Sequence, residues 1–273
     1  MLRNLFCIFV AGAWVTVLFP FACLVMLLTL SAEPSFWMVR NLWAPVLLWA
    51  GGARLVVIGR EHVDPRRPTL YISNHQSTID VPCLSRALRA NVRYVAKHQL
   101  KYVPVMGWYM WLTGFPFVDR GNRRSAVASL EKAGLRIRKG LSIVVYPEGT
   151  RSDDGRVLPF KKGPFMLALK AQVAICPVAI EGSGKLMPKN SWHITPGEIR
   201  VKVGAPIDVT GYTESDRERL MQDVRSQIID LHRSIGGLGG DKDDAVAAAG
   251  LEGVGRGAAP GPPSRSGEGS ALA

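Results

Sequence analysis

The N-terminal part of the chain contains a long run without any charged side chain. Residues 5–30 are all uncharged and mostly apolar, with Pro20 in the middle. A helix needs about 20 such residues to cross the hydrocarbon core of a bilayer, and proline is tolerated in membrane helices. The run is also too long for the roughly 7–15-residue apolar core of a signal peptide. We therefore expect a helix that spans or inserts deeply into a membrane.

A second apolar stretch follows at residues 36–53. It carries Trp37, Trp43 and Trp49 and is interrupted by Arg40. Tryptophan favours the boundary between membrane and water, so we expect this segment at headgroup level, packed on the first helix. The alternative is an ordinary buried helix of the following domain, because short apolar runs are difficult to classify. On the first interpretation, residues 1–53 form an N-terminal membrane-embedded helical part.

The chain changes character at residue 54. Short β-branched runs alternate with helical stretches, which predicts an α/β domain over residues 54–235 with a mixed, mostly parallel sheet flanked by helices. The expected strands are 55–58, 69–73, 93–96, 142–146, 173–180 and 199–203, and the expected helices are 79–89, 123–139, 163–171 and 215–235. Residues 236–273 are rich in glycine and contain no aromatic residue, so we expect a disordered tail there.

The chain is basic, with 34 Lys and Arg against 22 Asp and Glu and a net charge of +12. Such a balance suits an anionic membrane or nucleic acid. No helix-turn-helix, zinc-finger or RNA-binding pattern is visible, so we expect membrane and phosphate-bearing partners and no nucleic acid. The four cysteines form no C-x-x-C motif or zinc-ligand cluster, which indicates a reducing compartment. The positive-inside bias then predicts a cell-membrane protein whose basic domain faces the cytoplasm.

His75 and Asp80 lie between an expected strand and the helix that follows it. Ligands bind at strand ends in α/β sheets, and a carboxylate there can orient a histidine as a general base. On an ideal helix, positions five apart point about 140° away from each other, so the pairing requires a turn between the two residues. The alternative is a solvent-facing histidine beside an aspartate that complements the helix dipole.

A second candidate is the turn at residues 146–152, which follows another expected strand. Arg151 can grip an oxyanion in bidentate fashion, and backbone amides of the turn can assist. The alternative is a plain β-turn with a surface ion pair between Glu148 and Arg151.

Two further basic clusters lie at residues 119–124 and 160–163. Each taken alone is a solvated basic surface, but together they line one phosphate pocket if the strand ends converge.

Four sequence blocks in this order resemble those of the membrane-bound glycerolipid acyltransferases, in particular the 1-acylglycerol-3-phosphate acyltransferases. The blocks are NHQSTID at 74–80, GFPFVDR at 114–120, YPEGTR at 146–151 and CPVAI at 176–180. The resemblance covers about residues 55–205 and, more loosely, the N-terminal segments. Tyr146 stands where the family more often has Phe, and Pro116 stiffens the second block; neither departure removes a chemical group.

The resemblance implies a role for each matched residue. His75 is the general base and Asp80 its orienting partner. The resemblance places the phosphate-binding residues at Lys97, Arg120, Glu148, Gly149, Thr150 and Arg151. Lys97 matches a position held by Lys in many members, where it contacts phosphate or the developing oxyanion. The family's glycerolipid acyltransferase fold, without metal or cofactor, is implied as well.

The implied reaction moves a fatty acyl group from acyl-CoA or acyl carrier protein to the sn-2 hydroxyl of 1-acylglycerol-3-phosphate, which makes phosphatidic acid for phospholipid biosynthesis. Another lysophospholipid acceptor is an alternative. An acyl-enzyme on Ser77 is a mechanistic rival, although no G-x-S-x-G surrounds that residue. A lysolipid hydrolase and a non-catalytic lipid-binding module also remain open, but the second needs no base such as His75.

Overall fold

In the computed structural model of the protein, the described residues are 2–119, 121 and 123–240. The predicted disordered tail therefore lies outside them, apart from residues 236–240. Two of these five residues hydrogen bond to the loop before α7: Val157 donates its backbone N–H to the Gly239 carbonyl (2.8 Å), and Arg156 donates to the Gly240 carbonyl (3.1 Å).

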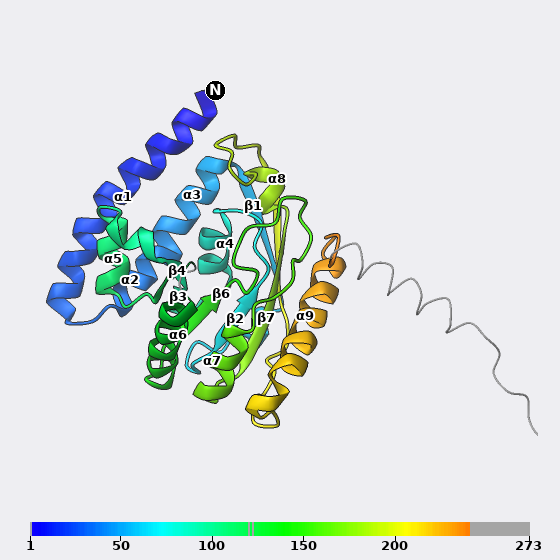
Figure 1. The fold of residues 1–273 in the computed structure, drawn as a ribbon. Coiled ribbons are helices and arrows are strands. Elements are labelled where there is room, and N and C mark those ends of the chain that lie inside the picture. The colour runs from blue at the N-terminus through cyan, green and yellow to red at the C-terminus, as the bar shows by residue number, and fades with distance from the viewer. Residues whose placement is uncertain (1, 120, 122, 241–273) are drawn as a thin grey trace, which may run out of the picture. The chain divides into compact units, whose positions relative to one another are not determined.

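A six-stranded sheet forms the centre of the described residues (Figure 1). Its strand order is β1-β8-β7-β2-β6-β3. The strands are β1 (Ala53–Ile58), β2 (Leu70–Ser73), β3 (Val92–Tyr94), β6 (Ser142–Val145), β7 (Ile175–Glu181) and β8 (Gly197–Val203). Neighbouring strands are parallel except β7 and β8, which run antiparallel. The prediction of a mixed, mostly parallel sheet is thus confirmed.

Helices cover both faces of this sheet. Along β2, Leu70 and Ile72 point to one face and Tyr71 to the other, as the two-residue period of a strand requires. The first face packs on α6 (Arg123–Arg138), α7 (Gly163–Ala171) and α9 (Arg217–Ser234). The second packs on α3 (Ala44–Gly51), α4 (Asp80–Ala87) and α8 (Ser183–Leu186). Apolar burial on both faces stabilises the sheet by about 25 cal/mol per Å².

A small parallel pair of strands lies outside the main sheet, and the sequence did not predict it. Lys97 of β4 (Ala96–Lys97) pairs with Val118 of β5 (Phe117–Val118). A 3-10 helix, η3 (His98–Tyr102), and helix α5 (Met106–Leu112) connect the two strands. The pairing holds the sequence after β3 next to the sequence that leads to position 120.

The N-terminal segments form a helical hairpin. Helix α1 (Leu2–Thr29) is long and apolar enough to cross a membrane, and its buried residues are Cys7 and Ala22. It packs on α2 (Glu33–Met38), the π-helical turn η1 (Val39–Trp43) and α3, and Trp14 donates to the Leu42 carbonyl (3.0 Å). The second apolar stretch thus packs on the first, as expected, and its α3 part also packs on the sheet, as the alternative of a buried domain helix expected.

Both ends of this hairpin also contact the α/β domain. At one end, Ile194 donates its backbone N–H to Asn4 (3.1 Å). At the other, the Arg93 guanidinium lies over the Phe36 ring, 4.0 Å from its centroid. The hairpin is therefore joined to the domain at both of its ends.

Candidate active site

The carboxyl ends of β3, β6, β2 and β7 lie at one edge of the sheet, because these four neighbouring strands are parallel. The loops that leave this edge carry most of the residues predicted to act. The edge is therefore the place where an α/β sheet binds its ligands.

The turn between His75 and Asp80 that the sequence required is present. Asp80 is the first residue of α4 and is fully buried. Its Oδ2 accepts three hydrogen bonds: from His75 Nδ1 (2.7 Å) and from the backbone N–H groups of Gln76 (2.8 Å) and Ser77 (2.9 Å). The backbone amides bend the chain around the carboxylate, so the imidazole reaches it although the residues are five positions apart.

The imidazole of His75 is fixed in orientation. Its ring stacks on Tyr146, with centroids 3.9 Å apart and planes 11° apart. Because an aspartate carboxylate only accepts, Nδ1 carries the proton and Nε2 is left as the basic nitrogen. The His75 side chain is 16% exposed, and no described residue hydrogen bonds to Nε2. The ring therefore offers one lone pair toward the surface.

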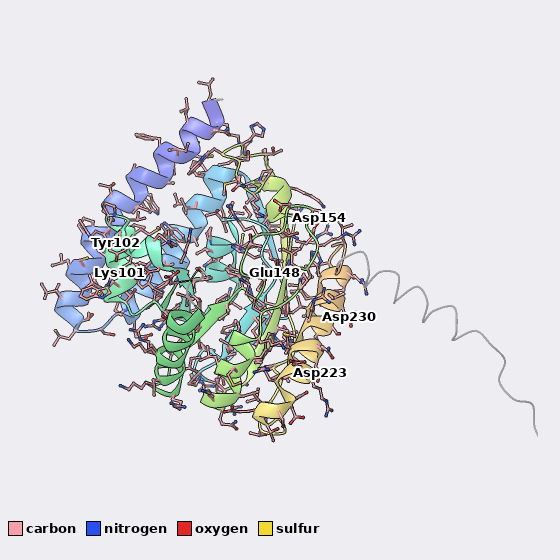
Figure 2. All side chains as sticks on the ribbon, in the orientation of Figure 1. Lys101, Tyr102, Glu148, Asp154, Asp223 and Asp230 are labelled. Carbon is pink, nitrogen blue, oxygen red and sulfur yellow. The ribbon has the colours of Figure 1, made fainter. Side chains whose placement is uncertain are left out.

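Glu148 holds the loop of His75 from the other side. It is buried near the centre of the molecule (Figure 2), and its Oε1 accepts the backbone N–H of His75 (3.1 Å). Burial raises the pKa of Glu148 to about 9, although the hydrogen bond from His75 acts in the opposite direction. Ser152 completes the clamp by donating its backbone N–H to the His75 carbonyl (2.8 Å). Glu148 thus points into the protein, and Arg151 has other partners.

Arg151 lies beside the His75–Asp80 turn. Its guanidinium donates to Thr78 Oγ1 (3.1 Å) and to Asn190 Oδ1 (3.4 Å). Both acceptors are neutral, and Glu148 instead accepts the backbone N–H of His75. The structure therefore does not contain the surface ion pair between Glu148 and Arg151 that the alternative predicted. Thr150, the preceding residue, is exposed.

A second cation, Lys161, lies close to this turn because residue 149 is a glycine. The φ of Gly149, +73°, is one that residues with a Cβ rarely adopt, and a Cβ would lie 2.7 Å from Lys161 Nζ. The Lys161 ammonium therefore lies directly over the turn that carries Arg151. Lys161 belongs to the basic cluster at residues 160–163, and the structure confirms that this cluster meets the turn.

Lys97 and Arg120 are the other two predicted phosphate ligands. Lys97 is exposed and follows β3 at the same edge of the sheet as His75, but no hydrogen bond or ion pair between these two described residues is present. Arg120 lies outside the described residues. The structure thus brings together His75, Asp80, Glu148 and the turn at residues 149–151.

Three buried polar residues behind His75 were not predicted: Gln76, Glu181 and His232. Glu181 Oε2 lies 3.0 Å from Gln76 Nε2 and 2.9 Å from His232 Nε2. Gly239 donates its backbone N–H to His232 Nδ1 (3.1 Å), so Nε2 carries the proton and donates to Glu181. Burial raises the pKa of Glu181, but hydrogen bonds from His232, Gln76 and Lys185 outweigh it and lower the pKa to about 2.

The sequence contains one signal for this cluster. His232 continues the four-residue spacing of the buried positions Leu220, Val224 and Ile228 on α9. A histidine on the buried face of a helix needs hydrogen-bond partners, but the sequence does not say which.

Comparison with known proteins agrees with this fold. The family model described as Acyltransferase matches residues 54–181. The 1-acyl-sn-glycerol-3-phosphate acyltransferase of Saccharomyces cerevisiae is 33% identical over 203 residues, which are 73% of this chain and 67% of that protein. The alpha enzyme of the same name from Mus musculus is 34% identical over 193 residues, covering 69% of this chain and 68% of that protein.

A solved structure extends the similarity to almost the whole chain. The crystal structure of PlsC, the 1-acyl-sn-glycerophosphate (LPA) acyltransferase from Thermotoga maritima, matches with a TM-score of 0.73 and 27% identity, covering 95% of this chain and 97% of that one. Fold and site thus define an α/β acyltransferase with a histidine–aspartate pair. The chain belongs to the 1-acyl-sn-glycerol-3-phosphate acyltransferase family, which confirms the resemblance seen in its sequence.

Proposed function

We propose that this protein transfers a fatty acyl group from a thioester to the sn-2 hydroxyl of 1-acylglycerol-3-phosphate and so makes phosphatidic acid. The observation that carries the proposal is the His75–Asp80 pair, 2.7 Å apart, beside a turn with the cations Arg151 and Lys161. A base next to an anion site suits an acceptor that has both a hydroxyl and a phosphate. The family's activity supports the same reaction.

His75 acts as the general base. Its Nε2 removes the hydroxyl proton while the acceptor oxygen attacks the thioester carbonyl, and Asp80 stabilises the imidazolium through Nδ1. When the carbon–sulfur bond breaks, His75 returns the proton to the departing thiolate. The new bond is the ester, and the released product is the thiol of the donor, either coenzyme A or acyl carrier protein. Base catalysis of this kind contributes about 10²–10⁴-fold.

Ser77 is a poor candidate for a covalent intermediate. Its side chain is buried, and its Oγ donates to the Met187 carbonyl (2.6 Å). An acyl-enzyme would require a hydroxyl that hydrogen bonds to a base. This geometry supports direct transfer, which needs neither a metal nor a cofactor.

The acceptor phosphate binds at the turn at residues 149–151 in this proposal. Arg151 supplies a planar guanidinium and Lys161 a point charge. Lys97 and Arg120 are proposed as further phosphate ligands, because the pairing of Lys97 with Val118 holds their two segments together.

The hairpin of α1 to α3 is proposed to attach the domain to the cytoplasmic face of the cell membrane. Because the hairpin contacts the domain at both ends, its geometry favours a helix that lies in one leaflet over one that crosses the bilayer. The apolar, exposed surface of α1 then contacts lipid. This placement gives the site access to a lipid acceptor and a water-soluble donor.

An acyl-transfer assay tests the proposal. Membranes with the full chain are incubated with 1-acylglycerol-3-phosphate and labelled acyl-CoA or acyl carrier protein, and wild type is compared with His75→Ala. The exposed His193 provides the matched control His193→Ala. We expect labelled phosphatidic acid from wild type and control and a loss of about 10²-fold or more in His75→Ala. Full activity of His75→Ala would exclude His75 as the general base.

The same assay, run with a measurement of lysolipid binding, separates the other candidate functions. Unlabelled fatty acid released from the lysolipid would indicate a lysolipid hydrolase, whereas labelled free fatty acid would come from hydrolysis of the donor thioester. Retained binding of the lysolipid without turnover in wild type would indicate a lipid-binding module. Faster acylation of lysophosphatidylglycerol would indicate another acceptor.

A further inference from the structure

The segment between the two small strands exposes a cluster of large apolar side chains. Trp108 and Trp111 on α5 are 55% and 61% exposed. We call this cluster the α5 surface; its members are Tyr102, Val103, Met106, Trp108, Trp111 and Leu112. Exposed apolar clusters of this kind mark interaction sites, because single exposed apolar residues are common but contiguous ones are not.

The α5 surface is held in shape by a tight backbone. Gly107 approaches the carbonyls of Leu100 and Lys101 so closely that a Cβ would lie 2.4 Å and 2.5 Å from their oxygens. Val105 has a φ of +64°, which is costly for a β-branched residue. Conformations of this cost persist where the surrounding structure enforces them, often at functional sites. The backbone that carries the two tryptophans is therefore tightly constrained.

The inner face of α5 joins this surface to the N-terminal hairpin. Tyr109 Oη lies 3.1 Å from Ser35 Oγ of α2, and the rings of Tyr109 and Phe36 are 6.4 Å apart. Figure 1 shows α5 next to α2, which packs on α1, and Figure 2 places Lys101 and Tyr102 on the same side. The α5 surface is thus connected through α2 to α1, the helix with the long exposed apolar surface.

We propose that the α5 surface inserts into the headgroup region of the same bilayer that holds α1, as a second lipid contact of the domain. This rests on the membrane placement proposed above. Tryptophan side chains prefer this depth, and the exposed Lys97 and Lys101 directly precede the cluster in the chain, where they can meet anionic lipid phosphates. The contact sets the carboxyl edge of the sheet against the bilayer, so that the lysolipid acceptor reaches Lys97 without leaving the lipid phase.

Fluorescence quenching tests the lipid contact directly. The full chain is reconstituted in vesicles of phosphatidylglycerol and phosphatidylethanolamine, with and without lipids brominated near the headgroup. Wild type is compared with Trp108→Gln/Trp111→Gln. We expect the intensity lost to the bromolipid to fall clearly in the double variant, since two quenched tryptophans are removed. An unchanged absolute loss would show that both tryptophans lie in water and would overturn the proposal.

An activity ratio tests the consequence for the acceptor. Acylation is measured with long-chain lysophosphatidate in vesicles and with a short-chain analogue that is monomeric in water. We expect the double variant to lose about tenfold on vesicles and to stay within twofold on the monomer. Trp108→Phe/Trp111→Phe should recover the vesicle activity, because it keeps the apolar area. Leu135→Gln, at an exposed apolar position on α6, is the matched control and should change neither.

The remaining outcomes are also decisive. An equal loss on both substrates would assign these tryptophans to the fold or the site and overturn the proposal. A loss of self-association in the double variant, with unchanged quenching, would assign the surface to a second copy of the chain. If wild type acylated neither substrate, the proposed function would fail, whereas the quenching result would still decide the lipid contact.

Discussion

Gln76 Nε2 lies 3.0 Å from Glu181 Oε2, while the backbone N–H of Gln76 donates to Asp80 Oδ2 at 2.8 Å. One residue therefore connects the ionised Glu181 to the oxygen that orients His75. His232 of α9 donates to the same Glu181 oxygen, so the last helix of the domain supports the catalytic turn from behind.

Replacing Gln76 by Ala should lower kcat by about 10²-fold, since misplacement by about 1 Å costs that much. The KM for the thioester donor should change little, because the buried Gln76 side chain is not accessible to a bound substrate. Steady-state kinetics with both substrates measures the two effects. Gln222→Ala, at an exposed position on α9, is the control. A kcat within twofold of wild type, in a variant with normal thermal stability, would show that Gln76 does not position the pair.

Changing Asp80 to Asn should reduce kcat by about 10²–10⁴-fold, because an amide cannot stabilise the imidazolium that forms on His75. An Asn oxygen can still accept the backbone N–H groups of Gln76 and Ser77, so the turn should persist. The measurement is kcat at saturating acceptor, with circular dichroism as the check on folding. Near-normal turnover in a folded variant would contradict the role assigned to the carboxylate.

Changing Arg151 to Ala should weaken the apparent affinity for the lysophosphatidate acceptor, with a rise in its KM by about 10–100-fold. This is the equivalent of losing a hydrogen bond of about 1.5–3 kcal/mol to a charged group. Arg151→Lys should recover only part of this, because an ammonium does not bind phosphate in bidentate fashion. Arg66→Ala, at an exposed arginine away from the site, should leave the KM unchanged. An equal rise for a monoacylglycerol acceptor, which has no phosphate, would argue against phosphate recognition.

The sequence predicted the main elements because their patterns are local. The β-branched run at residues 142–146 and the periodic pattern at 163–171 became β6 and α7 within a residue or two. Helix α5 was missed because only Gly107, Tyr109 and Met110 among its described residues point inward, which leaves little periodic signal. The two-residue strands β4 and β5 are shorter than any pattern that alternation can reveal.

The sequence predicted which residue types form the site, but it did not predict which distant residues hold them in place. The His75–Asp80 spacing required a turn, and the turn is there. The partners that impose it come from distant parts of the chain, such as Glu148 and His232, and no local pattern connects residues 70 or more positions apart. Glu148 was also expected among the phosphate-binding residues, whereas its buried carboxyl holds the His75 backbone.

Glu148 gives the folded protein a characteristic dependence of stability on pH. Its pKa is about 9 in the folded chain, because it is buried, and about 4.3 in an unfolded one. Between these values the folded state holds a proton that the unfolded state has released. Its contribution to stability is therefore complete below about pH 4.3 and is lost as the pH rises toward 9, with a slope of up to about 1.4 kcal/mol per pH unit.

Glu148→Gln should remove this part of the slope while its amide oxygen still accepts the His75 N–H, so that activity at pH 7 stays within about tenfold. Urea unfolding of the detergent-solubilised full chain at pH 5, 7 and 8.5 measures the change in the free energy of unfolding. Glu214→Gln, at an exposed glutamate, should keep the wild-type slope. Equal slopes for wild type and Glu148→Gln would mean that Glu148 is ionised in the folded protein, in which case His75 would sit beside two carboxylates and turnover would respond to salt.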